Sequence, residues 1–116
     1  MSHIKIYHNP RCSKSRKTLA IIEGKGFEPE IIKYLDNPPS IQELHTILTL
    51  LNLNPRDLMR KNESEYKDNH MNDNSLTTDE LLSLMHKFPK VIERPIVLAN
   101  GKAAIGRPPE SVLDII

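Results

Sequence analysis

The chain has 116 residues, of which 38% are hydrophobic and 27% charged, which is typical of a soluble globular protein with one modest core. The net charge is +1, so the overall charge favours neither a nucleic acid nor a membrane as a partner. The single cysteine excludes an internal disulfide, and no apolar stretch approaches the ~20 residues that a membrane helix needs. We therefore predict a cytoplasmic protein whose thiol stays reduced.

The first third of the sequence predicts a β-α-β unit. Residues 4–7 form a short β-type run, and a helical stretch from about 13 to 23 ends at a glycine pair, residues 24–26. Residues 30–34 predict a second strand. Two strands joined through a helix normally pair in parallel.

The middle of the chain predicts a helical insertion over about residues 40–90. Ser40 with Glu43, and Thr77 with Glu80, form capping-box patterns, each followed by apolar residues at helical spacing. The segment 61–75 between them is polar, and we expect a surface loop with at most a short helix.

The last third predicts a hairpin and a final helix. Residues 95–98 and 102–105 flank Asn100-Gly101, the dipeptide most typical of a tight hairpin turn. Pro108-Pro109-Glu110 then opens a helix, with Val112, Leu113 and Ile116 expected to face inward. The whole order describes an α/β fold, a thioredoxin-like mixed sheet (βαβ plus ββα) with a helical insertion, and we expect residues 1–116 to form a single domain.

The sole cysteine, Cys12, lies directly after a predicted strand and before a predicted helix. A helix N-terminus favours an anion and lowers the pKa of a thiol placed there. The first 20 residues carry five basic side chains and no acidic one, the first being Glu23; the basic residues are Lys5, Arg11, Lys14, Arg16 and Lys17. Because these polar flanks disfavour burial, we interpret Cys12 as a reactive thiolate rather than a structural cysteine.

Other polar side chains lie close to Cys12 in the sequence. Ser13 and Ser15 can donate hydrogen bonds to the sulfur, and for His8 a structural role is as plausible as a catalytic one. Ser15 stands where a Cys-x-x-Cys redox pair has its second cysteine. A covalent adduct on Cys12 must therefore be released by an external thiol, such as glutathione or glutaredoxin.

Three arginines, Arg60, Arg94 and Arg107, lie in segments without predicted secondary structure. Arginine offers planar, cationic donors that bind an oxyanion in bidentate fashion. Each of them alone could be a solvated surface residue. In a thioredoxin-like sheet, however, the loop before Pro95 would lie beside the Cys12 loop.

Together these residues resemble the glutaredoxin-dependent arsenate reductase family over nearly the whole chain. The stretches that carry the resemblance are Ile6-Tyr7-His8-Asn9-Pro10-Arg11-Cys12-Ser13-Lys14-Ser15-Arg16, Leu58-Met59-Arg60-Lys61-Asn62, Glu93-Arg94-Pro95-Ile96-Val97 and Gly106-Arg107-Pro108. The resemblance implies a cis peptide before Pro95. It also implies that no cofactor is bound, that glutathione is a co-substrate, and that glutaredoxin is the protein partner of a monomer.

The resemblance further implies a role for each site residue. Cys12 would attack arsenate, glutathione would displace and reduce the adduct, and glutaredoxin would complete the cycle as arsenite leaves. The arginines match the family's oxyanion-binding residues, and His8 and Ser15 match those that lower the thiol pKa. Two departures from well-studied plasmid-type members bear on substrate and rate. Arg11, Ser13 and Lys14 differ from the small residues found beside the thiol there, and the chain ends at Ile116, soon after the last predicted helix begins.

Two alternatives stay open at this point. One is a redox-sensing, RNA-polymerase-binding transcription regulator of the related family. Ser15, which stands in place of a second cysteine, argues against this alternative. The other is a monothiol oxidoreductase with another substrate. A tyrosine-phosphatase loop is excluded because Thr18 stands where Cys-x5-Arg needs arginine, and the five histidines show no metal-ligand spacing.

Overall fold

A computed structural model describes residues 3–116 and divides the chain into two compact units. The first unit comprises Met1–Asn37 with Arg94–Ile116, and the second comprises Pro38–Glu93. The expectation of a single domain with an insertion over about residues 40–90 stays a prediction.

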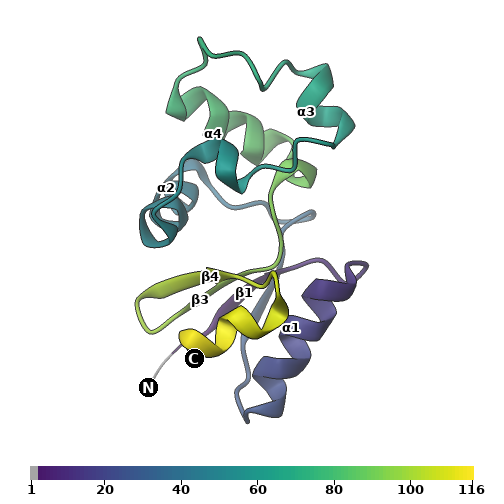
Figure 1. Ribbon diagram of the computed structural model, residues 1–116, viewed down its shortest axis with the longest axis vertical. Helices are drawn as coiled ribbons and strands as arrows, with labels where there is room; N and C mark the ends of the chain where they lie inside the picture. Colours follow the sequence, from purple (N-terminus) through teal and green to yellow (C-terminus); the bar gives the residue numbers. More distant parts are fainter. Residues whose placement is uncertain (1–2) are drawn as a thin grey trace. The chain divides into compact units, whose positions relative to one another are not determined.

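The first unit contains the predicted strands and the helix that follows the cysteine (Figure 1). Its elements are β1 (Lys5–His8), α1 (Ser13–Gly24), β2 (Glu30–Lys33), β3 (Ile96–Ala99), β4 (Lys102–Ile105) and the 3₁₀ helix η3 (Pro109–Asp114). The strands form one sheet in the order β2-β1-β3-β4. β1 pairs in parallel with β2 and antiparallel with β3, and β4 runs antiparallel to β3. This mixed sheet confirms the predicted α/β, thioredoxin-like fold.

One face of this sheet carries the core of the first unit. Ile6 of β1 is in register with Val97 of β3, and both side chains are fully buried. α1 and η3 pack against each other on this face (Figure 1), and their apolar side chains close the core. The buried members of this cluster are Ile4, Ile6, Ile22, Val97, Ala99, Val112 and Ile115.

The hairpin between β3 and β4 forms as the sequence predicts. Asn100 and Gly101 have φ values of 54° and 73°, so both central residues adopt the left-handed conformation of a tight hairpin turn. The Asn100 side chain also donates a hydrogen bond to the carbonyl of Ile115 at 2.6 Å. The turn is thereby tied to the end of the chain.

The last helix differs from the prediction because it is a 3₁₀ helix. With three residues per turn, Val112 and Ile115 fall on the same side, and both are buried. Leu113 was expected to face inward but is 43% exposed. The expectation for Leu113 was therefore wrong, since it assumed the wider spacing of an α-helix.

The second unit is helical. It contains α2 (Ile41–Leu51), η1 (Pro55–Leu58), α3 (Ser64–Asp68), α4 (Thr78–Lys87) and η2 (Pro89–Val91). Both predicted capping boxes form: the side chains of Ser40 and Thr77 accept the N–H groups of Glu43 and Glu80, whose carboxylates accept the cap N–H groups in return. The apolar faces that begin after these caps pack α2 against α4.

Candidate functional site

The loop that carries Cys12 is held by its own backbone. Cys12 is the N-cap of α1, and its N–H donates to the carbonyl of Asn9 at 3.0 Å. The Asn9 side chain accepts the N–H of Arg11 at 3.0 Å, and the Arg16 guanidinium donates to the Pro10 carbonyl at 2.9 Å. These bonds place the sulfur at the first turn of α1, where the sequence predicted it.

Ser15 and His8 form a buried pair beneath this loop. The Ser15 hydroxyl oxygen accepts the N–H of Asn9 at 3.0 Å and lies 2.6 Å from His8 Nδ1. Burial, followed by the charges of Lys33 and Arg16, lowers the pKa of His8, so its ring is neutral near pH 7. We therefore assign the hydroxyl as donor to Nδ1. Among the described residues this hydroxyl makes no hydrogen bond to the Cys12 sulfur, and it acts on the loop instead.

Two of the predicted arginines lie in the same unit as Cys12. The Arg107 Nε donates to the carbonyl of Arg94 at 2.9 Å, and its Nη2 lies 3.9 Å from the Cys12 sulfur. The Nε of Arg94 is buried and has no hydrogen-bond partner among residues 3–116. The Arg94–Pro95 peptide is cis, as the resemblance implied, and so is Arg107–Pro108, which was not expected.

Gly106 holds the Arg107 segment against the rest of the site. Its N–H donates to the Pro95 carbonyl at 2.9 Å. A Cβ at this position would overlap the Thr18 hydroxyl and lie 2.7 Å from Pro95 Cγ. Only glycine permits this close approach. The Gly106-Arg107-Pro108 tripeptide carries part of the family resemblance, but no local pattern in the sequence indicates that residue 106 meets α1 and the Pro95 loop.

The pKa of the Cys12 thiol is lowered from its ordinary value of 9.0. Burial is the largest single influence and acts to raise the pKa. It is outweighed by the N–H of Ser15, the Arg94 guanidinium and the N–H of Lys14, which all favour the thiolate. The sulfur makes no capping hydrogen bond of standard geometry, so these donors act as nearby dipoles and charge.

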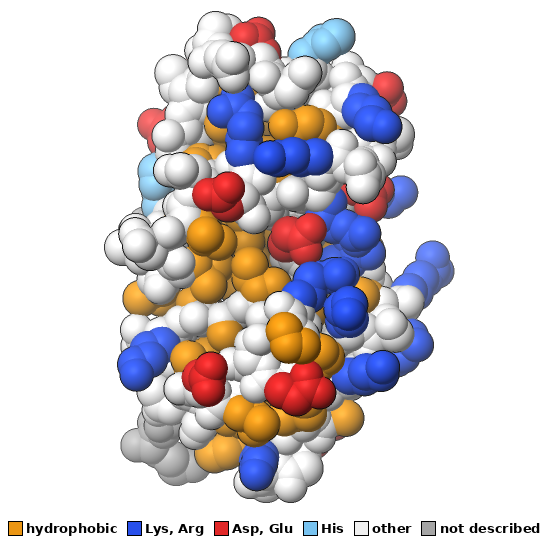
Figure 2. Space-filling model, viewed as in Figure 1, with side chains coloured by type: hydrophobic (Ala, Val, Ile, Leu, Met, Phe, Trp, Pro, Cys, Tyr) orange, Lys and Arg blue, Asp and Glu red, His pale blue; other side chains and the backbone are white. Residues whose placement is uncertain are grey.

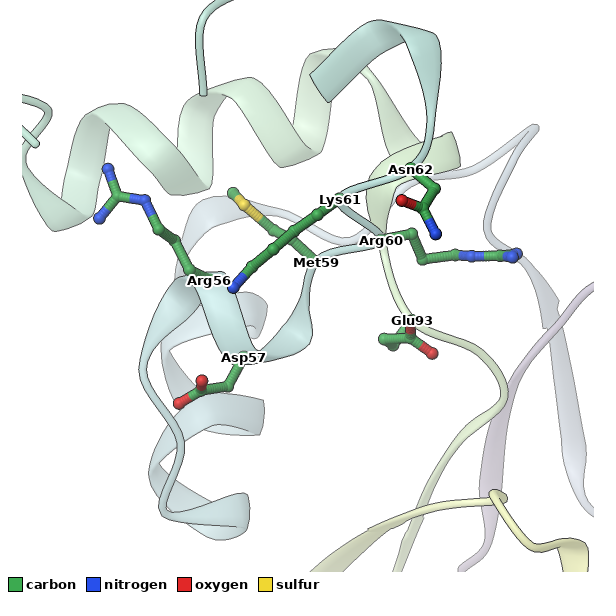
Figure 3. Close-up of a pocket in the computed structure, with 7 residues that line it drawn as sticks. All are labelled: Arg56, Asp57, Met59, Arg60, Lys61, Asn62 and Glu93. Atoms are coloured by element: carbon green, nitrogen blue, oxygen red, sulfur yellow. The ribbon is translucent and has the colours of Figure 1, made fainter. Parts of the chain in front are cut away.

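Arg60 belongs to the second unit, where a short bridge between Met59 and Ile92 positions it. Its N–H donates to Val91, its Nε lies 3.8 Å from a Glu63 carboxylate oxygen, and its Nη1 is buried with no hydrogen-bond partner among the described residues. It lines a hollow of about 410 Å³, in which Figure 3 shows Arg60 and Glu93 on one side and Arg56 on the other. Its predicted role at the Cys12 site stays a prediction.

The first unit thus brings together an accessible, acidic thiol, a neutral histidine–serine pair and two guanidinium groups. This arrangement suits a nucleophilic sulfur attacking the central atom of an anion whose oxygens are held by arginine. Residues 3–116 contain no group of three or more His, Cys, Asp or Glu side chains arranged to hold a metal ion. Within the same residues, no helix is long and apolar enough to cross a membrane.

Comparison with known proteins gives consistent matches over nearly the whole chain. The model of the ArsC family matches residues 7–115. The uncharacterized protein YfgD of Escherichia coli strain K12 is 51% identical over 114 residues, covering 97% of this chain and 96% of its own. An arsenate reductase of Neisseria meningitidis serogroup A is 48% identical over 113 residues, with 97% of each chain covered. The structure of an arsenate reductase from Vibrio cholerae superposes with a TM-score of 0.94 at 50% identity, covering 98% of each chain.

Proposed function

This chain belongs to the ArsC family and functions as an arsenate reductase, and we propose that Cys12 is its nucleophile. The observation that supports this assignment best is the lowered pKa of the Cys12 thiol beside Arg94 and Arg107. The lowered pKa increases the fraction of Cys12 that is thiolate at a given pH, and the thiolate is the form of the sulfur that attacks arsenic. His8 and Ser15 support the nucleophile by fixing the loop on which it lies.

The reaction begins when the Cys12 thiolate attacks the arsenic of arsenate. A sulfur–arsenic bond forms, an arsenic–oxygen bond breaks, and the oxygen leaves as water after protonation. Arg94 and Arg107 hold the remaining oxygens, because guanidinium groups offer paired donors of fixed geometry. The unpartnered Nε of Arg94 is one donor for this purpose. We assign Arg60 as a third oxyanion ligand, on the family resemblance and on its unpartnered Nη1.

Reduction requires thiols from outside the chain. Cys12 is the only cysteine, and Ser15 occupies the position of a resolving thiol. Glutathione attacks the Cys12–arsenic(V) adduct, the arsenic–sulfur bond breaks, and the Cys12 and glutathione sulfurs supply two electrons to arsenic as they form a mixed disulfide. Arsenite is released, and glutaredoxin then reduces the mixed disulfide and restores the Cys12 thiol. In this scheme the protein is a cytoplasmic monomer. It binds no cofactor or metal ion, and it does not act on a nucleic acid or at a membrane.

A coupled assay tests this proposal. Purified protein is mixed with arsenate, glutathione, glutaredoxin and glutathione reductase, and arsenate-dependent oxidation of NADPH is followed. We expect turnover by the wild type and none above background by Cys12→Ser, because serine is not ionised near pH 7. Circular dichroism of both proteins checks that the fold is retained. Turnover that persists in Cys12→Ser, or that does not depend on arsenate, would contradict the proposal.

A further inference from the structure

We propose that three exposed cations at the start of α1 bind the carboxylates of glutathione as its thiol approaches Cys12. They are Arg11, Lys14 and Lys17, called here the α1 cation patch. The inference deepens the proposed function and rests on it, because glutathione is the co-substrate assigned there. It identifies which groups of this chain recognise that co-substrate.

The charges of the α1 cation patch are not compensated within the protein. None of its three side chains forms an ion pair or a hydrogen bond among residues 3–116, whereas the neighbouring Arg16 is bonded to the Pro10 carbonyl. The first acidic residue of the chain, Glu23, lies in the last turn of α1, ~14 Å along the helix axis from Lys14. Figure 2 shows Lys and Arg side chains gathered on the side of the molecule where α1 lies in Figure 1.

This arrangement is unfavourable for the free protein. Lys14 and Lys17 are three residues apart on one helix, so they are neighbours and repel each other. Cations near a helix N-terminus also oppose the helix dipole. A bound anion relieves both effects, and a dicarboxylate relieves them better than a single charge.

The size of the patch matches a tripeptide. Lys17 lies five residues beyond Cys12, or ~7.5 Å along α1, and Arg11 lies on the other side of the cysteine. Three extended residues span ~10 Å. Glutathione carries its thiol on the central residue and a carboxylate at each end, so both ends can reach cations while the sulfur meets Cys12.

The test follows thiol–disulfide exchange at Cys12 without arsenate. Because Cys12 is the only cysteine, dithiobis(nitrobenzoate) converts it alone to a mixed disulfide. An incoming thiolate then forms a new disulfide with Cys12, and thionitrobenzoate leaves as a coloured thiolate whose absorbance gives the rate. Glutathione is compared with its glycine monoethyl ester, which lacks one carboxylate. The ratio of the two rate constants cancels any effect of a substitution on Cys12 itself.

For wild-type Cys12 we expect the ratio of the rate constant with glutathione to that with the ester to be about 3-fold higher than the same ratio measured with the free disulfide reagent. The variant Lys14→Gln/Lys17→Gln should lose this preference, and salt should weaken it in the wild type. The matched control Lys25→Gln/Lys102→Gln removes the same charge at the far end of α1 and on β4, and should keep the wild-type ratio.

An equal ratio in the wild type and Lys14→Gln/Lys17→Gln would overturn the inference. Equal loss of the preference for glutathione in the control Lys25→Gln/Lys102→Gln would also overturn the inference, because the preference would then depend on the net charge of the protein and not on the α1 cation patch. If the ratio is unchanged but the variant slows the glutaredoxin step, the patch binds the protein and the glutathione assignment is wrong. The exchange reaction contains no arsenate, so the ratio can be measured even if the coupled assay shows no arsenate turnover. A failure of the glutathione inference can therefore be told apart from a failure of the proposed function.

Discussion

At the scale of single residues, the acidity of Cys12 depends on groups that the backbone supplies as much as on charged side chains. The N–H groups of Ser15 and Lys14 and the guanidinium of Arg94 together overcome the effect of burial. The Ser15 hydroxyl contributes differently, because its hydrogen bonds go to Asn9 and His8. Ser15 is thus a positioning residue for the loop, and its removal should show in stability.

The first prediction concerns Ser15→Ala. This change leaves the Asn9 N–H and His8 Nδ1 buried without their partner, so the free energy of unfolding should fall by about 1–3 kcal/mol. Urea denaturation followed by circular dichroism measures it. The control is Ser13→Ala, an exposed position on the same turn, where the change should stay within about 0.5 kcal/mol. Equal stability of the two variants would show that the hydroxyl does not hold the loop.

At the scale of elements, the site depends on how closely three segments approach one another. Thr18 of α1, Pro95 before β3 and Gly106 after β4 meet where a Cβ on residue 106 would not fit. The adjacent Arg107 is bonded to the Arg94 carbonyl and directs Nη2 towards Cys12. The packing of Gly106 therefore controls where the Arg107 guanidinium, a proposed oxyanion donor, lies.

The second prediction compares two glycines. Gly106→Ala should lower the free energy of unfolding by about 1–3 kcal/mol through overpacking and raise the KM for arsenate through displacement of Arg107. Gly24→Ala is the control, because nothing lies within 4 Å of a Cβ built there and the residue ends α1. It should stabilise the protein by about 0.4–1 kcal/mol. Thermal unfolding and arsenate titration measure both effects, and an unchanged KM in Gly106→Ala would argue against the coupling to Arg107.

At the scale of the whole molecule, the ionisation of Cys12 is linked to folding. The thiol ionises at lower pH in the folded protein than in the unfolded chain, so between the two pKa values the unfolded state binds more protons. The resulting stabilisation is fully present above the unfolded value of 9.0 and is lost as pH falls through the folded pKa. The lowered pKa of His8 has a separate effect, a loss of stability as pH falls below 6.5.

The third prediction follows from this linkage. The free energy of unfolding of the wild type, relative to that of Cys12→Ser, should rise with pH up to about 9 and then level off. Both proteins retain His8, so its titration cancels in the difference. Chemical denaturation at a series of pH values measures the two curves. Curves that run parallel over this range would mean that the Cys12 pKa is the same in the folded and unfolded states.

Neighbouring residues were enough to predict most of the elements of this protein and to place its cysteine between a strand and a helix, whereas the role of that cysteine as nucleophile stays a proposal. The turn at Asn100-Gly101 and the caps at Ser40 and Thr77 are local patterns, and each forms as predicted. The position of Cys12 between a strand and a helix is equally local, and so is the cationic surrounding that favours its thiolate.

The assembly of the site follows from contacts between segments that are distant in the sequence. Arg107 and Cys12 are 95 residues apart, and nothing in either segment states that a guanidinium will lie 3.9 Å from the sulfur. The partner of the Ser15 hydroxyl and the need for glycine at position 106 likewise arise from segments that folding brings together. Leu113 shows the same limit, since its exposure follows from a 3₁₀ helix that the local pattern did not indicate. Local patterns specify backbone dihedral angles and the apolar faces of helices and strands, whereas contacts between distant segments depend on the packing of the whole sheet.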